Sequence, residues 1–348
     1  MVLLNLRQTV KTLVGAIYAT KHHVPWPAHW RDWGIEPATL SDTMQRLGKM
    51  AEHVPGSSLG KGHPDTARIR SEYALSTRRL IDASGVHAAL GSARQLAALD
   101  MRDGEAFHLF GAMLATASET ALSRARTSLK PWVVMHVTCE ARVERARESM
   151  RSFETASPDG FSQIIVLGRP EAHAFAFDVS TRTLTVPSPD TYEHLPAKVI
   201  AAMAFLAMCT NVEAVLKVDD DHRLRSAPAL LAAFRRTARP HPLQVGECLD
   251  AGALGLHART WHFGKTSGAS VGERPFTYVG PSRWANGASG YLINKLTLRL
   301  MYWSYVYFQD AIDRGLYEDM TVSDFIERQG GRLVQQSMAP ILGTVGDY

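Results

Sequence analysis

The sequence predicts an α/β protein with a mostly parallel central sheet, preceded by an α-helical region. From Pro131 onward, apolar runs of strand length alternate with helical segments. Residues 66–130 show helical periodicity instead, with Ala- and Leu-rich faces. An apolar run at residues 212–218 ends directly in three aspartates, and ligands of open α/β sheets collect at the carboxyl ends of strands. We therefore expect a helical N-terminal region, 1–130, and a nucleotide-binding domain, 131–348.

The composition is that of an ordinary globular protein. The 348 residues are 45% hydrophobic and 21% charged, which allows one or two domains. The net charge of +4 is spread over 38 basic and 34 acidic residues without a long block of one sign, so no nucleic-acid partner is expected. Three scattered cysteines do not make a disulfide framework or a thiolate zinc site, and they favour a reducing compartment.

Residues 1–21 have the spacing of an amphipathic helix. They lack the continuous apolar core of a signal peptide, and the longest apolar run, Val199 to Met208, is about half of the roughly 20 residues that span a bilayer. We expect a cytoplasmic protein without a transmembrane segment. The helix either packs on the core or makes a peripheral membrane contact. Residues 54–65, rich in Gly, Pro and Ser, are expected to form an exposed, flexible loop or linker.

Strand and helix signals alternate along the second region. A Val-rich strand at 131–139, a helix at 140–153 and a second strand at 161–168 predict a βαβ unit and hence a parallel sheet. A short strand at 182–187, a helix at 193–209 and the strand at 212–218 complete the series.

Asp219, Asp220 and Asp221 stand where that last strand gives way to a loop. Three adjacent carboxylates repel one another, so a divalent cation is an obvious partner. Carboxylate and water ligands suit Mn²⁺ or Mg²⁺, which share their coordination with substrate phosphates. An acidic turn without a ligand is the structural alternative.

The triplet resembles the Lys-x-Asp-Asp-Asp element of the β1,3-glycosyltransferase family, which includes Fringe and the β1,3-galactosyl- and N-acetylglucosaminyltransferases. Three more segments resemble that family in the same order, over about residues 131–331. Residues 190–198 are similar to its Asp-x-Tyr-x-Asn-Leu-x-x-Lys segment, with His194 in place of Asn. Residues 284–294 resemble its Gly-x-Gly-Tyr element, and residues 317–326 its Glu-Asp-Val-x-x-Gly element, with Ser323 in place of Gly.

The resemblance implies a GT-A-like fold and an inverting transfer of a sugar from a UDP-sugar, with Mn²⁺ or Mg²⁺ between protein carboxylate and donor diphosphate. It makes Asp221 the first choice for the metal ligand and gives Asp219 and Asp220 contacts to the donor or to the metal. The acceptor would be a saccharide or a lipid-linked saccharide. The family's C-terminal metal-binding histidine has no counterpart beyond Gly331, which leaves water, His257 or His262 for that place.

Inversion needs a base that deprotonates the acceptor hydroxyl. Glu318 and Asp319 occupy the segment that supplies this base in the family, and Asp319 aligns with the catalytic carboxylate. Their structural alternative is a pair of acids at a helix N-terminus.

Further residues are candidates for the donor and sugar sites. Thr138, Arg142, Lys198 and Lys217 are the candidate donor contacts, and solvated helix charges are the common alternative for such residues. Small residues let a backbone approach a sugar closely. The candidate sugar or acceptor contacts are Gly287, Ala288, Ser289, Gly290 and Trp261. A structural turn and a core aromatic are the respective alternatives.

We expect a hexosyltransferase, of β1,3 type by the resemblance, acting in surface polysaccharide or glycoconjugate synthesis. A metal-dependent phosphotransferase would also place aspartates at a strand end, but the first strand ends without an aspartate nucleophile. A non-catalytic sugar- or nucleotide-binding scaffold is the other alternative, and it would not need Glu318 and Asp319. No Gly-x-Gly-x-x-Gly follows the first strand, which disfavours a Rossmann oxidoreductase.

Overall fold

A computed structural model describes residues 114–344, apart from 116, 157–159, 173, 255–259, 268–280 and 282. The chain divides between Thr120 and Ala121, and nearly all described residues belong to the second unit. The expected N-terminal helix of residues 1–21, the loop at 54–65 and most of the helical region 1–130 lie outside the described residues. Within that region, helix α6 (Glu119–Ser128) is described.

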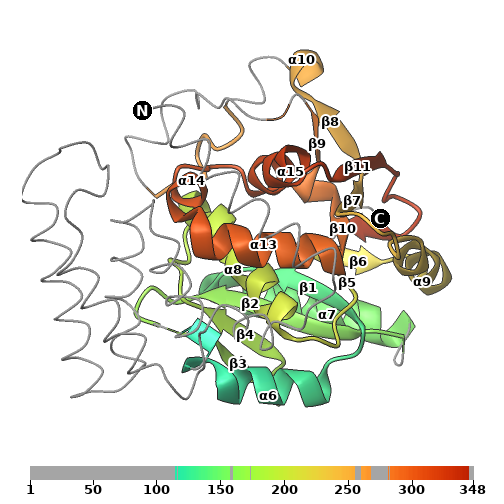
Figure 1. Ribbon diagram of the computed structural model, residues 1–348. Helices are drawn as coiled ribbons and strands as arrows, with labels where there is room; N and C mark the ends of the chain where they lie inside the picture. Colours follow the sequence, from blue (N-terminus) through green and yellow to red (C-terminus); the bar gives the residue numbers. More distant parts are fainter. Residues whose placement is uncertain are drawn as a thin grey trace, which may run out of the picture. The chain divides into compact units, whose positions relative to one another are not determined.

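Eight strands of the described part form one mixed, mostly parallel sheet in the order β11-β7-β10-β5-β1-β2-β4-β3 (Figure 1). Their bounds are Trp132–Val137 for β1, Ser162–Gly168 for β2, Ala176–Asp178 for β3, Thr183–Val186 for β4, Ala214–Asp219 for β5, Leu243–Gly246 for β7, Tyr291–Asn294 for β10 and Arg332–Gln335 for β11. Two small ribbons pair β6 (His222–Leu224) with β12 (Leu342–Thr344), and β8 (Cys248–Asp250) with β9 (Arg283–Ala285). The α/β class and the parallel sheet are therefore confirmed.

The strand order puts a topological switch point between β1 and β5. From β1 the chain passes outward through β2 to β4, then returns to place β5 on the other side of β1. At such a switch point the connections leave neighbouring strands in opposite directions, and a crevice opens at their carboxyl ends. Thr138 follows β1 there, and Asp219 is the last residue of β5.

Two strands run against the others. β3 is antiparallel to β4 at one end of the sheet, and β10 lies between β5 and β7, antiparallel to both. Antiparallel β10 brings the start of its strand, next to the glycine-rich segment, to the carboxyl end of β5: Tyr291 is paired with Lys217. The segment at 287–290 therefore lies beside the aspartates although it is about 70 residues away in sequence.

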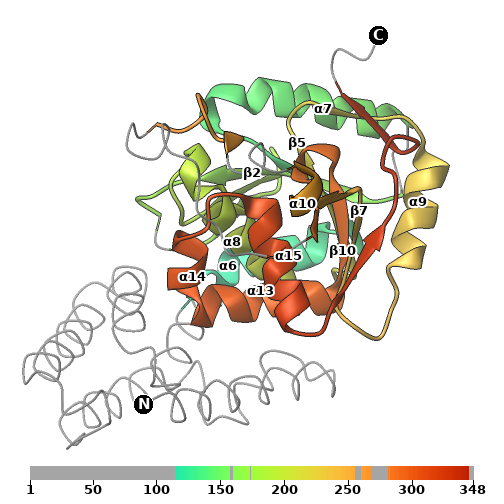
Figure 2. The same cartoon turned by 90° about the horizontal axis from the view of Figure 1, so that it is seen from above.

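Helices cover both faces of the sheet, as Figure 2 shows. The core on one face joins Phe153 of α7 and Phe234 of α9 to sheet residues such as Val134 and Leu216. On the other face α8 packs against the sheet and against α13 and α15. The remaining bounds are Val143–Ala156 for α7, Leu195–Met208 for α8, Ala227–Arg236 for α9, Ala251–Leu254 for α10, Lys295–Tyr307 for α13, Gln309–Asp313 for α14 and Glu318–Arg328 for α15.

Helix α8 explains the longest apolar run of the sequence. All its residues from Pro196 to Met208 are buried, because the helix is enclosed by the sheet on one side and by α13 and α15 on the other. An apolar circumference is what such a doubly covered helix needs. Within the described part of the chain, no helix is both long and apolar enough to span a bilayer.

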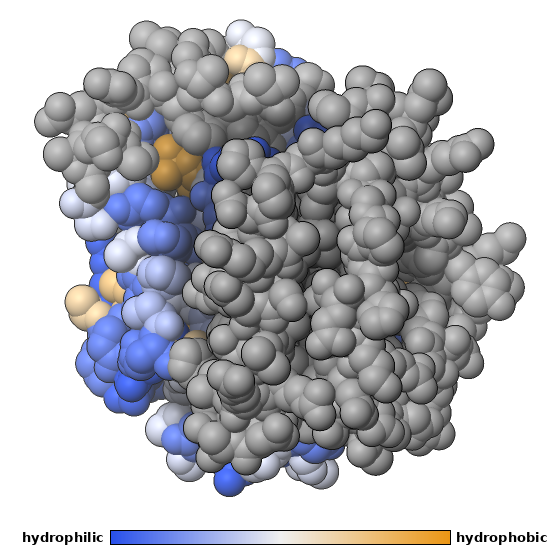
Figure 3. Space-filling model, turned by 60° about the vertical axis from the view of Figure 1, so that its left-hand side comes forward, coloured by the Kyte–Doolittle hydropathy of each residue, from blue (hydrophilic) through white to orange (hydrophobic). Residues whose placement is uncertain are grey.

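The visible described surface in Figure 3 is mostly hydrophilic, with small separate hydrophobic patches. Large apolar side chains that are well exposed are few among the described residues: Val179, Val334, Trp261 and Phe263. Two of these four belong to the short segment 260–267, which lies beside the site described next.

Candidate functional site

The three aspartates occupy the tight connection between β5 and β6. Asp219 ends β5, Asp220 and Asp221 form the turn, and β6 begins at His222. The side chains of Asp219 and Asp221 are 38% and 35% exposed, whereas that of Asp220 is 7% exposed. Two of the three carboxylates are therefore accessible to a ligand, and the third is part of the interior.

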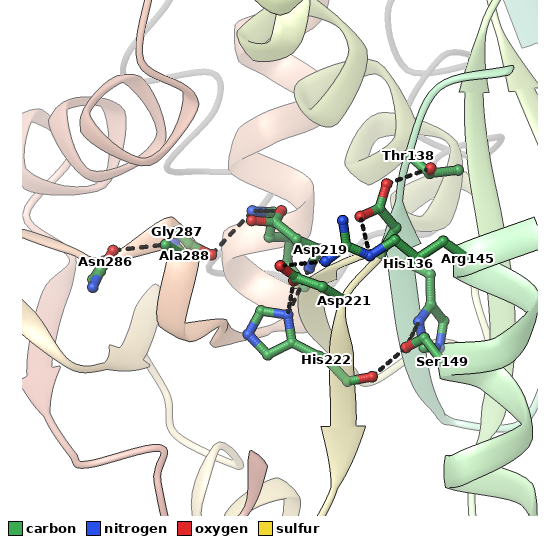
Figure 4. Close-up of polar contacts among 12 residues, drawn as sticks. His136, Thr138, Arg145, Ser149, Asp219, Asp221, His222, Asn286, Gly287 and Ala288 are labelled. Carbon is green, nitrogen blue, oxygen red and sulfur yellow. Dashed lines mark hydrogen bonds and ion pairs between the residues drawn. The ribbon is translucent and has the colours of Figure 1, made fainter. Parts of the chain in front are cut away.

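Each carboxylate of the turn has protein partners on the β1 side. The Thr138 hydroxyl donates to Asp220 Oδ2 over 2.7 Å, which joins the ends of β1 and β5. Arg145 of α7 donates from Nη2 to Asp221 Oδ2 over 3.2 Å, and its Nε lies 3.8 Å from Asp220 Oδ1 (Figure 4). Arg142, the expected donor contact, is an exposed residue of a 3-10 helix (Glu140–Arg142). Arg145, one helical turn further on, is the arginine that reaches the aspartates.

His222 folds back onto the turn that precedes it. Its buried Nδ1 lies 3.2 Å from the Asp219 amide nitrogen and 3.4 Å from Asp221 Oδ1, so its tautomer decides which of the two it bonds. Contact with His222, together with Arg145, lowers the pKa of Asp221 below its usual value. Sequence reasoning missed His222, although its position directly after the triplet was the available signal.

Lys217 connects the aspartates to the two downstream segments. Its ammonium lies 2.7 Å from Asp219 Oδ1 and 3.5 Å from Glu318 Oε1, and it donates to the Gly287 carbonyl over 3.2 Å. Burial alone would lower the pKa of this lysine, but Asp219 and Glu318 outweigh burial and hold the pKa above its usual value. Lys217 is therefore a buried cation that is neutralised within the protein.

Glu318 is the buried acid of the downstream pair, with 3% of its side chain exposed. Its Oε1 accepts from the Tyr291 hydroxyl over 2.9 Å, and its Oε2 has no hydrogen-bond partner. Burial raises the pKa of Glu318 to about 7. The nearby cation Lys217 lowers this pKa, but repulsion from Asp319 and Asp219 raises it further, so Lys217 offsets only part of the increase.

This raised pKa makes stability depend on pH. In the interval from the ordinary value of 4.5 to about 7, folded Glu318 holds a proton that the unfolded chain has released. The contribution of Glu318 is thus fully present below pH 4.5 and should fall by roughly 3 kcal/mol as pH rises to about 7. Buried His136, whose pKa is lowered, acts in the opposite direction below its ordinary value of 6.5, so the measured quantity is the difference between the wild type and Glu318→Gln. Urea unfolding of both proteins across this interval gives that difference in slope, and equal slopes would contradict the assignment.

Asp319 is half-buried at the first turn of α15. Its Oδ2 accepts from the Gly287 amide over 2.9 Å and its Oδ1 from the Met320 amide over 2.8 Å. Burial raises the pKa of Asp319, although both amide bonds act in the opposite direction. Each carboxylate oxygen retains a further lone pair, so the group can still accept a proton.

The glycine-rich segment forms a 3-10 helix, η4 (Gly287–Ser289), between β9 and β10. Gly287 meets both Lys217 and Asp319 through its backbone, and a Cβ there would lie 3.2 Å from Asp319 Cβ. Gly290 has φ of 75°, and a Cβ on it would stand 3.1 Å from the Lys217 carbonyl. Gly290 is thus favoured by its backbone conformation and by the nearby Lys217 carbonyl, and Gly287 leaves room for the Asp319 side chain. Contact of this segment with a sugar stays a prediction.

The other two small residues of the segment, Ala288 and Ser289, have surroundings that differ from those of the two glycines. Ala288 is exposed, while the hydroxyl of Ser289 donates to Glu247 Oε2 over 2.7 Å. Ser323, which replaces the family's glycine, is buried; it accepts from the Ala285 amide and donates to Gln244. This serine therefore ties α15 to the strand ends beside the site.

Lys198 is a structural link. Its buried ammonium donates to the Thr138 carbonyl over 2.7 Å and to Asp190 Oδ1 over 2.8 Å. Asp190 in turn accepts from the amides of Glu140 and Gly168. The segment at 190–198 therefore fixes the backbone that carries Thr138, and the expected contact of Lys198 with a donor stays a prediction.

The aromatic rings of Trp261 and Tyr192 both lie near the Lys265 ammonium, in the neighbourhood of Asp219. Lys265 Nζ stands 4.2 Å from the ring centroid of Trp261 and 5.8 Å from that of Tyr192. Burial and nearby carboxylates, first among them Asp319, raise the pKa of the Tyr192 hydroxyl. Tyr192 and Lys265 are thus further residues of this region that sequence reasoning did not single out.

Of the two histidines considered as metal ligands, His262 is described, and it faces Tyr317. His262 is fully buried, and its Nδ1 lies 2.8 Å from the Tyr317 hydroxyl. His257 lies outside the described residues. Among the described residues, no three His, Cys, Asp or Glu side chains converge on one point. Mg²⁺ and Mn²⁺ commonly take one or two protein carboxylates with substrate phosphates and water, and Asp219 with Asp221 match that pattern.

A cavity of about 400 Å³ lies elsewhere, beside β2 and β3. It is lined mainly by apolar and uncharged residues such as Leu129, Phe161 and Gln163, together with the pair Glu154 and Arg182. None of the expected site residues lines it.

The candidate site is thus the cluster of Asp219, Asp221, Lys217, Glu318 and Asp319. No protein-family model matches the chain, and a search of curated proteins finds no significant match.

Proposed function

We propose that the protein is an inverting, metal-dependent glycosyltransferase with a GT-A-like fold, which transfers a sugar from a UDP-sugar to a saccharide acceptor. The observation that carries the proposal is the position of Lys217. Its ammonium contacts the acidic turn, the glycine-rich segment and the first turn of α15 at once. Three of the four segments that resemble the family therefore meet at one buried cation, although about 100 residues separate the first from the last.

Donor binding falls to the carboxyl ends of β1 and β5. Asp221 and Asp219 are the accessible carboxylates there, and they would hold Mn²⁺ or Mg²⁺ together with the donor diphosphate. The bound cation would neutralise charge on the departing nucleoside diphosphate. Arg145 adds a partly exposed guanidinium beside Asp221, and guanidinium groups pair well with phosphate oxygens.

Acceptor activation falls to Asp319. It is more accessible than Glu318, its position is fixed by the Gly287 and Met320 amides, and its raised pKa makes its carboxylate a better proton acceptor. Glu318 holds Lys217 from the other side, so that Lys217 is shared between the metal-binding turn and the residue next to the proposed base. One ammonium group would thus fix the position of the donor-binding residues relative to the acceptor-binding residues.

The test is release of UDP from a panel of UDP-sugars with Mn²⁺ present and absent. We expect one donor to be hydrolysed only with metal, and Asp221→Asn to reduce the rate about 100-fold or more because it removes a metal-binding charge. Asp178→Asn makes the same charge change on β3, at the far edge of the sheet, and should leave the rate unchanged.

The opposite outcomes are equally clear. If no UDP-sugar binds or reacts with metal present, the transferase proposal fails, and a non-catalytic binding role becomes the better explanation of the site. Equal loss in Asp221→Asn and Asp178→Asn would mean that the acidic turn has no special part in turnover.

A further inference from the structure

A chain of buried polar groups lies behind the acidic turn, and the proposed chemistry does not use it. His136 of β1, Ser149 of α7 and Gln163 of β2 are each between 0 and 4% exposed, within an otherwise apolar core. Buried polar groups reduce stability unless they are hydrogen-bonded, so this arrangement calls for an explanation.

The three side chains bond one another in sequence. Gln163 Nε2 donates to the Met150 carbonyl over 3.2 Å, and its Oε1 lies 3.0 Å from His136 Nε2. His136 Nδ1 lies 3.1 Å from Ser149 Oγ. The Ser149 hydroxyl donates to the His222 carbonyl over 2.6 Å, as Figure 4 shows.

One tautomer of the neutral His136 imidazole fits the contact with Gln163. Burial lowers the pKa of His136 to about 3, so the imidazole is neutral. With its proton on Nε2, His136 donates to Gln163 Oε1, and its Nδ1 faces the Ser149 hydroxyl. The Ser149 hydroxyl has one hydrogen, and its shorter contact, over 2.6 Å, is the donation to the His222 carbonyl. The chain therefore has a fixed direction, and it ends on the backbone of the acidic turn.

His222 carries the effect to the aspartates. Its carbonyl is held by Ser149, while its ring reaches back to the Asp219 amide and to Asp221. Fixing this one residue therefore fixes both ends of the turn. On the outer side of the turn, Arg145 is 41% exposed, so the buried chain is the better ordered support.

We propose that Ser149, His136 and Gln163 are positioning residues that hold the Asp219–Asp221 turn ready for its metal and diphosphate. The contacts above support the part of the proposal that concerns the position of the turn. The part that concerns metal and diphosphate rests on the proposed function. Such buried support of a metal-binding side chain commonly changes affinity without touching the ligand itself.

The matched pair of variants is Ser149→Ala and Ser152→Ala. Both serines lie on α7 and contact β6: Ser149 bonds the His222 carbonyl, and Ser152 accepts from the Leu224 amide over 3.3 Å. Backbone hydrogen exchange of residues 214–224 needs no substrate. We expect Ser149→Ala to speed exchange at residues 219–222 about tenfold, with the other elements unchanged, and Ser152→Ala to leave these residues at the wild-type rate.

The second readout is the apparent Mn²⁺ affinity in donor hydrolysis, which should weaken about tenfold in Ser149→Ala with little change in maximal rate at saturating metal. Gln163→Met tests the far end of the chain with a side chain of similar length, and it should show the same pattern more weakly. It also replaces Ser149→Ala if that variant does not fold.

The two proposals fail separately. If the variants of the chain exchange at wild-type rates at residues 219–222, the positioning role is wrong even in an active enzyme. If the exchange difference is present but no UDP-sugar reacts, the positioning stands and the proposed function fails. An equal rise in exchange throughout the protein would show general destabilisation and would also overturn the positioning role.

Discussion

Lys217→Met is expected to destabilise the protein by about 3–5 kcal/mol and to abolish donor turnover. The lysine is 2% exposed and neutralises Asp219 and Glu318, so its removal leaves one carboxylate buried without its cation. Methionine keeps most of the side-chain volume, which separates the loss of charge from the loss of packing. Urea unfolding at pH 8 measures the effect on stability, because Glu318 is ionised there.

Two further variants make this prediction specific. Lys217→Met combined with Glu318→Gln should recover part of the lost stability, since the uncompensated charge is removed as well. Lys295→Met breaks the ion pair of Lys295 with Glu213, in which both side chains are partly exposed, and should cost less than about 1 kcal/mol. A similar small cost for Lys217→Met would mean that the ion bridge does not organise the site.

Asp319→Asn should lower kcat about 1,000-fold while donor and metal affinity stay near the wild-type values. Asparagine retains the size of the side chain and one carbonyl acceptor, but it cannot take the proton of an acceptor hydroxyl. Steady-state kinetics with a saccharide acceptor, together with binding of UDP and Mn²⁺, separate the two effects.

Asp324→Asn is the control on the same helix, because Asp324 forms an ion pair over 2.7 Å with Arg328, one helical turn further along. Its kcat should match that of the wild type. If Asp319→Asn keeps its kcat while Glu318→Gln loses it, the base is Glu318, and the roles of the two acids must be exchanged.

Much of the sheet was predictable from local sequence. The Val-rich runs of β1 and β2 and the apolar run of β5 have the length and composition of strands covered on both faces, and each forms where expected. The amphipathic helix α7 was predicted from its periodicity, whereas α8 was predicted from a long apolar run, which suits a helix that is buried all round.

Among the short strands, β4 was predicted at residues 182–187, whereas β3, β7, β10 and β11 were not. β3 has three residues and β7, β10 and β11 have four each, which is too few to show a period. That β10 runs antiparallel between β5 and β7 depends on long-range pairing, for which residues 291–294 carry no local signal.

The site was predicted by type and order of residue, while its contacts were not. Carboxylates after β5 and at the start of α15 were both identified from the sequence, yet the ion pair of Lys217 with Glu318 joins residues 101 positions apart. The choice between Arg142 and Arg145 depended on where the 3-10 helix ends and α7 begins, a boundary that sequence patterns locate only within a few residues.

The place of β10 has a consequence for synthesis. As the chain leaves the ribosome, β5 and β7 are complete before residue 291 emerges, and the strand that must separate them has not yet been made. Until then each presents an open edge with unpaired amides and carbonyls, which invites pairing with other chains. Chains ending near residue 280 should therefore aggregate. In such chains Lys217 would also lack Gly287 and Glu318, its two partners from later in the sequence.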